Sequence, residues 1–242
     1  MPRIALSAAL LTIVSGAIVT STTHGVTVHT VLSVLFAALA VALALRSRTP
    51  LTWAVLALVA MEAIPGLNLL HAILAQLIFA LTVLIAHNVR PCLHQAASLR
   101  RFALAIPPLV LLQTALGAAY RHKALGVLPH MGGAMLVVLL ILLVSVIILQ
   151  RIPTPGPLRS SAIALIVVVL VQISLGIAAF LMRLLDADQA PVFAWITVAH
   201  VTTGALTLGA SVILAMQFGR DSISDRELDP ASQSTRSSGP ST

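Results

Sequence analysis

Long uninterrupted apolar runs limit how this chain can fold more than any other feature. Eight runs follow one another along the 242 residues, at roughly 4–21, 28–45, 51–65, 68–87, 102–120, 129–150, 160–182 and 192–217. A helix that crosses a bilayer needs about 20 apolar residues, and the third run, which ends at Pro65-Gly66, is short of that. A β-barrel would alternate apolar and polar residues in strands of about ten residues, and these runs are continuous. The sequence therefore predicts an all-α integral membrane protein with eight transmembrane helices.

Composition supports this class and excludes others. Hydrophobic residues make up 59% of the chain and charged residues 9%, so a large water-exposed domain is excluded. The single cysteine, Cys92, rules out an intramolecular disulfide and a Cys-rich metal site. The formal net charge of +7 comes from basic residues scattered singly between apolar runs, which indicates contact with membrane lipid and no nucleic acid. The first run, preceded by Arg3, also resembles a signal peptide, but the repeat described below requires it as a helix.

Basic residues are divided unequally between the two sides of the membrane. With loops assigned alternately, one side carries Arg121, Lys123 and Arg183, and the opposite side carries the other eleven of the 14 Lys and Arg residues. Cytoplasmic loops are enriched in Lys and Arg. This bias predicts a multi-pass protein of the cell inner (plasma) membrane with both termini in the cytoplasm.

The chain contains an internal duplication, in which the first four predicted helices and the last four are two copies of one unit. Ser15-Gly16-Ala17 matches Leu116-Gly117-Ala118, and Gly25-Val26 matches Gly126-Val127. We therefore expect two tandem four-helix bundles, an N-terminal half at 1–95 and a C-terminal half at 96–217. Residues 218–242 are rich in Ser, Asp, Arg and Pro and predict a disordered cytoplasmic tail.

Four histidines lie near the beginning of apolar runs, and each has a small residue four positions later. The pairs are His29 with Ser33, His71 with Ala75, His130 with Ala134, and His200 with Gly204. Residues i and i+4 share a helix face, so each histidine is expected to have space beside it for a flat ligand. The predicted topology places all four on the outer side, two from each half, on the second and fourth helices. Opposed helices carrying one histidine each can supply the two axial ligands of a haem iron.

Other interpretations of these histidines remain open. A single histidine near a membrane helix end is often an interfacial polar residue. Zinc or copper would need three or four converging ligands, and a proton relay would need acidic partners, whereas Glu62 is the one carboxylate within a predicted span. His24 and His122 lie in corresponding outer loops and are candidates for contact with a porphyrin edge, while His87 and His94 are expected at the cytoplasmic surface.

The outer loops of the second half contain cations that suit the propionates of a haem. Arg121 and Lys123 are the candidates, with Arg183 following the seventh run. They are equally consistent with ordinary loop charges. The outer loops of the first half contain no Lys or Arg, so a haem there would be held differently.

Taken together, the repeats and histidines resemble the haem A synthases, duplicated eight-helix proteins of cytochrome oxidase assembly. The resemblance covers about residues 4–217 and depends on Gln-x-x-Leu-Gly phrases, at 113–117 and 172–176, and on the His-x-x-x-small motifs. It implies that His130 and His200 bind a prosthetic haem b. It also implies that His29 and His71 hold haem O, whose methyl group is oxidised to the formyl of haem A. Haem O synthase and oxidase assembly factors are the partners that it suggests.

Two departures from that family bear on catalysis. The family typically has a glutamate three residues before the first histidine, where this chain has Val26, and many bacterial members have a cysteine pair in the first outer loop, which this chain lacks. Val26 cannot accept a proton, so it cannot act as a general base in the oxidation. That role would have to fall to His24 or Glu62. Three functions follow as hypotheses: a haem A synthase-like enzyme, a non-catalytic bis-histidine b-type cytochrome, and a solute transporter. A parallel repeat disfavours the last, because many transporters are built from inverted repeats.

Overall fold

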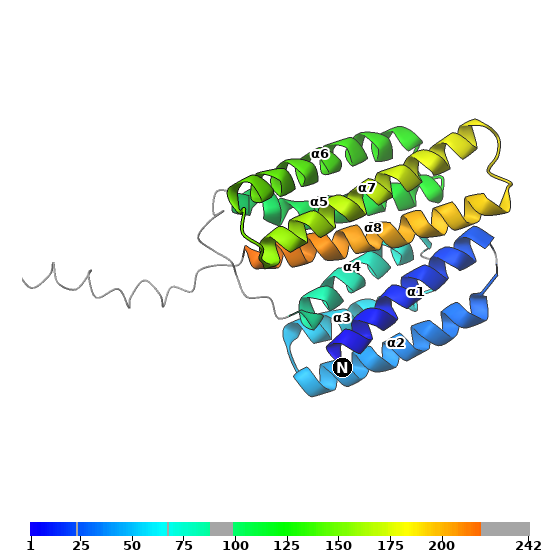
Figure 1. Cartoon of the computed structure of the whole chain (residues 1–242). Coiled ribbons are helices and arrows are strands. Elements are labelled where there is room, and N and C mark those ends of the chain that lie inside the picture. The colour runs from blue at the N-terminus through cyan, green and yellow to red at the C-terminus, as the bar shows by residue number, and fades with distance from the viewer. Residues whose placement is uncertain (23, 67, 88–98, 219–242) are drawn as a thin grey trace, which may run out of the picture.

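The computed structural model describes residues 1–22, 24–66, 68–87 and 99–218. These residues form eight α-helices and no strand (Figure 1). The helices are α1 (Pro2–Thr22), α2 (Val26–Ser47), α3 (Pro50–Glu62), α4 (Asn68–Ala86), α5 (Arg100–Arg121), α6 (Val127–Arg151), α7 (Pro157–Leu184) and α8 (Pro191–Gln217).

Seven of these helices, all except α3, are long and apolar enough to cross a membrane. The prediction of a helical, multi-pass membrane protein is therefore confirmed. The shorter α3 has 13 residues and is about 20 Å long. The hydrocarbon core of a bilayer is about 30 Å thick, so α3 is too short to cross it alone.

Local signals explain the short α3. The Oγ1 atom of Thr49 accepts a hydrogen bond from the backbone N–H of Thr52 at 3.3 Å, and Pro50 occupies the first turn, where its missing N–H costs nothing. After Glu62 the chain turns at Pro65 and Gly66, and Gly66 has a φ of +88°, which favours glycine. The helix therefore ends one turn before the third apolar run does.

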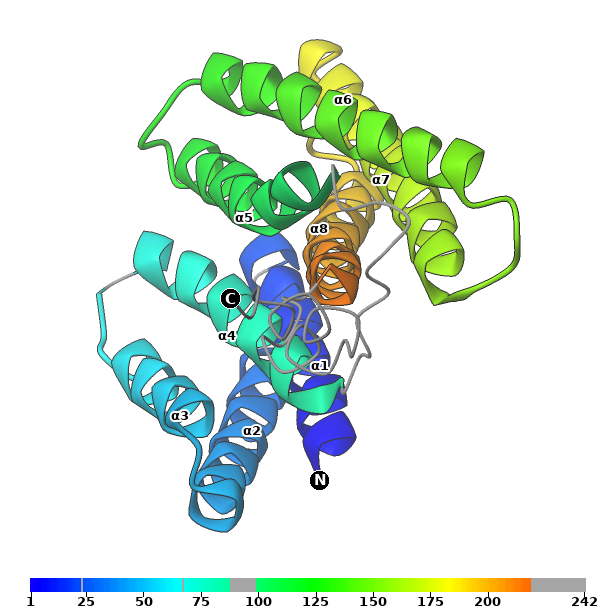
Figure 2. The ribbon, with the colours of Figure 1, turned by 90° about the vertical axis from the view of Figure 1, so that its left-hand side faces the viewer.

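The helices pack in two similar sets, which we call the first half (α1–α4) and the second half (α5–α8). In the first half, α1 and α3 each contact both α2 and α4, and in the second half α5 and α7 each contact both α6 and α8. Figure 2 shows the two sets one above the other, viewed toward the helix ends. They meet where α1 and α4 contact α8 and where α4 contacts α5.

Burial distinguishes the central helices from the outer ones. In α8, 56% of the most apolar 18-residue window is buried, against 11% in α7. Large apolar side chains on α6 are exposed, among them Leu128, Met135 and Leu136 at 77%, 74% and 72%. Such a surface is unfavourable in water and is expected where a protein faces lipid.

All four histidines lie at the same end of their helices, as expected from the sequence. His29, His71 and His130 are each the fourth residue of α2, α4 and α6, and His200 lies further along α8. Helices α2, α4, α6 and α8 run in the same direction (Figure 1), so these positions are at one end of the molecule.

Two expectations about domain limits fall partly outside the described residues. The limit between residues 95 and 96 lies there, as does the predicted tail at 218–242 apart from its first residue, Phe218. Phe218 directly follows α8 and is buried, and its carbonyl oxygen accepts a hydrogen bond from Nε of Arg100 at 3.0 Å.

Candidate functional site

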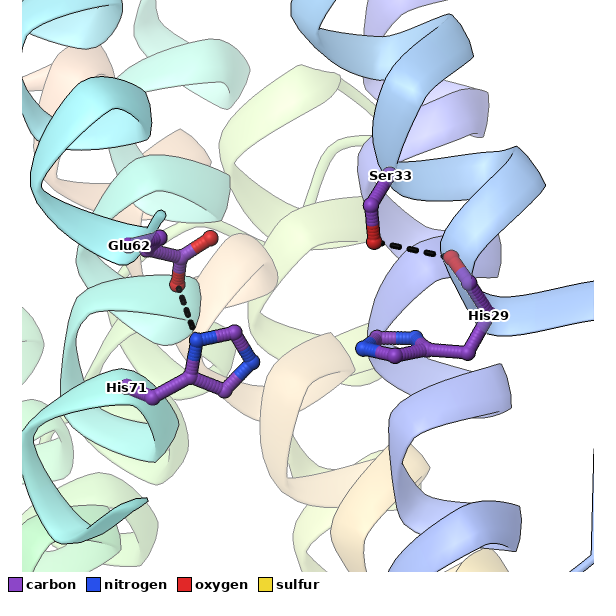
Figure 3. A network of polar contacts seen from close by, with 4 residues as sticks. All are labelled: His29, Ser33, Glu62 and His71. Carbon is purple, nitrogen blue, oxygen red and sulfur yellow. Dashed lines mark hydrogen bonds and ion pairs between the residues drawn. The ribbon is translucent and has the colours of Figure 1, made fainter. Parts of the chain in front are cut away.

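The four histidines form two pairs with nearly identical geometry, one in each half. In the first pair, His29 and His71, the ring centres are 6.2 Å apart, and in the second pair, His130 and His200, they are 6.3 Å apart. The ring planes are inclined at 84° in both pairs. Figure 3 shows the first pair, in which a ring nitrogen of each histidine points toward the other ring.

Three of the four rings lie against a glycine on the preceding helix. A Cβ atom added to Gly16, Gly117 or Gly176 would lie 3.1, 2.9 or 3.0 Å from Cε1 of His29, His130 or His200, respectively. Side chains at these positions would therefore push the rings out of place. The matched Ser-Gly-Ala and Leu-Gly-Ala phrases of the duplication thus provide room for the histidine rings.

Hydrogen bonds indicate which ring nitrogen carries the proton in the first pair. Oγ of Ser15 donates to the carbonyl of Thr12 at 2.9 Å and lies 3.0 Å from Nδ1 of His29. Since the hydroxyl proton is already used, Ser15 accepts a hydrogen bond from Nδ1–H. This leaves Nε2 of His29 with a free lone pair.

His200 has an equivalent arrangement, because its Nδ1 lies 3.2 Å from the backbone carbonyl oxygen of Gln172. A carbonyl can only accept, so Nδ1 of His200 carries the hydrogen and Nε2 carries a lone pair. A histidine that binds a metal usually donates its other N–H in this way.

Two glutamines lie beside the second pair. Nε2 of Gln113 lies 2.9 Å from Nδ1 of His130 and donates to the carbonyl of His130 at 2.7 Å. The amide nitrogen of Gln172, Nε2, lies 3.4 Å from the ring nitrogen Nε2 of His200. The amide oxygen of Gln172, Oε1, accepts a hydrogen bond from the Thr203 hydroxyl. In the sequence these glutamines mark the repeat, but their contacts join different helices and could not be predicted from it.

The small residues four positions after the histidines have different surroundings. A Cβ atom on Gly204 would meet Nε2 of Gln172 at 3.3 Å, so the Gln172 side chain fills the space expected there for a flat ligand. Oγ of Ser33 donates to the carbonyl of His29 within its own helix at 2.8 Å. Ala75 and Ala134 are half-buried.

Each of the four histidines follows a segment with a polar residue four positions before a glycine, and the repeated phrases at 113–117 and 172–176 are two of these segments. The four segments are Thr12–Gly16, Glu62–Gly66, Gln113–Gly117 and Gln172–Gly176. The structure relates three of them directly to the next histidine through the glycine contact. In the remaining segment, Gly66 has open space around it.

His71 consequently has a different partner from the other three histidines. Its Nδ1 lies 4.0 Å from Oε1 of Glu62, at the end of α3 (Figure 3). The His71 side chain is 44% exposed and that of Glu62 is 16% exposed. The first pair therefore combines one histidine held by a hydroxyl with one that faces a carboxyl group.

Arginines gather at the end of the molecule where the histidines lie. Nη2 of Arg121 donates to Oγ of Ser21, in the first half, at 2.8 Å. Arg183 donates to the Tyr120 hydroxyl at 2.8 Å and lies 5.5 Å from the Phe193 ring centre. The loops of the first half at the histidine end contain no Lys or Arg, but Arg121 reaches the first half from α5.

The remaining candidates lie at the surface or outside the described residues. Lys123, His24 and His122 are exposed in loops. Nδ1 of His87, at the end of α4, lies 3.2 Å from the carbonyl of Val83, and His94 and Cys92 are outside the described residues.

Comparisons of the chain with protein-family models, with curated proteins and with solved structures found no significant match.

Proposed function

We propose that this membrane protein binds haem, with each half forming a four-helix bundle that holds one haem between its two histidines. The observation that carries the proposal is the spacing of the two pairs, 6.2 and 6.3 Å between ring centres. An imidazole nitrogen binds a metal at about 2 Å and the ring centre lies about 1 Å behind it, so two rings on one iron have centres about 6 Å apart. The same spacing in both halves supports a common ligand.

The number of donors favours haem over a bare ion. Among the described residues, no group of three or more His, Cys, Asp or Glu side chains could hold a metal ion. Zinc and copper usually take three or four protein ligands. A haem brings the four nitrogens of its porphyrin and needs only the two axial ligands that a histidine pair supplies.

The Nδ1 contacts of His29 and His200 fit this group, and the two glutamines of the second pair require an adjustment. Ser15 and the Gln172 carbonyl hold Nδ1–H of His29 and His200, which leaves Nε2 for iron. The Gln172 amide lies 3.4 Å from Nε2 of His200 and must rotate away before a ligand binds there. The Gln113 amide presents Nε2, a donor, to Nδ1 of His130, so it must also move before His130 can carry its hydrogen on Nδ1 and leave Nε2 for iron.

For the reaction, we propose a haem A synthase-like oxidoreductase that converts the methyl group of haem O to the formyl of haem A at the first pair. This oxidation takes one oxygen atom from water and releases four protons and four electrons, so it requires an electron acceptor. The haem b of the second pair supplies electron transfer when bound. His29 and His71 bind and orient the substrate, and His130 and His200 bind the haem b. Ala75 and Ala134, with Ser33 and Gly204, line the same helix faces.

A non-catalytic b-type cytochrome is the second candidate, and position 26 favours it. Val26 is the first residue of α2 and is 58% exposed, so no carboxylate is present where the resembled family has its glutamate. Among the carboxyl groups that the structure describes, Glu62 contacts a histidine of the two pairs.

The cell inner membrane, with both termini cytoplasmic, is the proposed location. The excess of basic residues on one side supports this orientation. The histidine pairs would then face the outer side, where haem O synthase or oxidase assembly factors could deliver or accept haem.

A pyridine haemochrome assay with mass analysis of the extracted porphyrins tests the proposal. We expect the purified full-length protein to contain haem b with a six-coordinate, bis-histidine optical spectrum. Supplying haem O and an electron acceptor to membranes that carry the protein distinguishes the two candidates. Accumulation of haem A supports the enzyme, haem without product supports the cytochrome, and purified protein without any porphyrin contradicts both.

We expect Arg121→Gln to release haem about tenfold faster than the unchanged protein. A hydrogen bond to a charged group contributes about 1.5–3 kcal/mol, and Arg121 is the cation that reaches both halves. Transfer of haem to an excess of apomyoglobin measures the release rate. Arg101→Gln, which removes an exposed cation at the opposite end of α5, is the matched control. Equal rates of haem release in the two variants would show that Arg121 does not contribute to haem binding.

A further inference from the structure

The partner of His71 distinguishes the two histidine pairs chemically. Nδ1 of His29, His130 and His200 faces neutral groups, a hydroxyl, an amide and a backbone carbonyl. Nδ1 of His71 faces the carboxyl group of Glu62. In the repeat, Glu62 on α3 corresponds to Gln172 on α7, so the first half has a carboxyl group where the second half has an amide. Gln113 on α5 is the amide whose Nε2 faces Nδ1 of His130.

The surroundings of Glu62 indicate that its carboxyl group has a specific task. Its Oε1 atom is buried and has no hydrogen-bond partner, although it is the atom that faces His71 at 4.0 Å. A buried acceptor without a partner costs free energy. A hydrogen bond from Nδ1–H of His71 would satisfy it after an approach of about 1 Å.

Local structure permits that approach. Glu62 is the last residue of α3, and the following turn ends at Gly66, which has open space around it. Figure 3 shows Glu62 on one side of the His71 ring and His29 on the other, so the second ring nitrogen points toward His29. A hydrogen bond to Glu62 would therefore hold Nε2 of His71 in the direction of the other ligand.

We propose that Glu62 is a positioning residue that makes His71 a stronger electron donor than the other three histidines. This inference rests on the proposed haem binding. A carboxylate that accepts the N–H of a metal-bound histidine raises the basicity of that ligand. A more basic axial ligand stabilises oxidised iron, so the haem held by the first pair has the lower reduction potential. Electrons would then pass from a haem held by the first pair to one held by the second.

A redox titration of purified, haem-loaded protein, followed optically, tests this inference with Glu62→Gln. The first-pair component is assigned as the one that persists in His130→Ala. We expect Glu62→Gln to raise the midpoint potential of that component and to leave the other unchanged, because glutamine keeps the shape of the side chain and removes the charge. Gln113→Glu places a carboxyl group beside Nδ1 of His130 and should lower the potential of the second-pair component.

The outcomes separate this inference from the proposed function. Protein that never contains haem contradicts the proposed function. Unchanged potentials in Glu62→Gln, with both haems retained, overturn the role of Glu62 alone. If Glu62→Gln loses the first haem, Gln113→Glu decides: a lowered second potential supports the carboxylate effect, and an unchanged one overturns it.

Discussion

Replacing His130 or His200 by alanine is expected to remove about half of the haem from the purified protein, because a six-coordinate iron loses one of its two protein ligands. Only the haem bound by the second pair should be lost. His130 and His200 belong to α6 and α8, and neither helix carries a ligand of the first pair. The measurement is the haem content per chain together with the optical spectrum of the haem that remains.

The matched control for both variants is His122→Ala. His122 follows α5 directly, lies close to His130 in sequence and is exposed. We expect it to keep its full haem content. An unchanged spectrum in both His130→Ala and His200→Ala would exclude this pair as axial ligands, whatever the first pair binds.

The second large effect is expected from Gly117→Val. A Cβ atom at Gly117 would lie 2.9 Å from Cε1 of His130, closer than real Cβ contacts, so the ring must move. Overpacking of this kind costs about 1–3 kcal/mol, and a displaced ring no longer lies opposite His200. We expect the second haem to be lost while the helical circular dichroism remains.

Gly132→Val is the control for that substitution. Gly132 lies in α6 two residues after His130, and a Cβ atom there would have no neighbour within 4 Å. Valine has a higher helix propensity than glycine, so this variant should keep its haem and lose no stability. Normal haem content in Gly117→Val would show that close packing of the ring against α5 is not required.

Helix positions could be predicted from this sequence with good accuracy, since apolar runs and their Pro and Gly interruptions act locally. The prediction failed in detail at the third run, where the turn at Pro65 and Gly66 shortens α3. The placement of His29, His71 and His130 near helix beginnings followed from the same local signals and is confirmed.

The surroundings of the histidines were only partly predictable. Sequence analysis assigned space beside each ring to the residue four positions later, because helix periodicity is the only geometry that a sequence offers directly. The structure places glycines of the preceding helix, such as Gly117 and Gly176, against the rings instead, and it fills the space at Gly204 with Gln172. These contacts join residues on different helices, and periodicity within one helix carries no information about them.

The sequence by itself determined that this is a helical membrane protein and that four histidines occupy repeated positions in it, because hydrophobicity and helix signals operate over a few turns. Only the tertiary structure decided that the rings pair at 6.2 and 6.3 Å, that Glu62 faces His71, and that Arg121 of the second half binds Ser21 of the first. The physical reason is that these distances depend on how neighbouring helices pack, and that packing is set by side chains far apart in the chain.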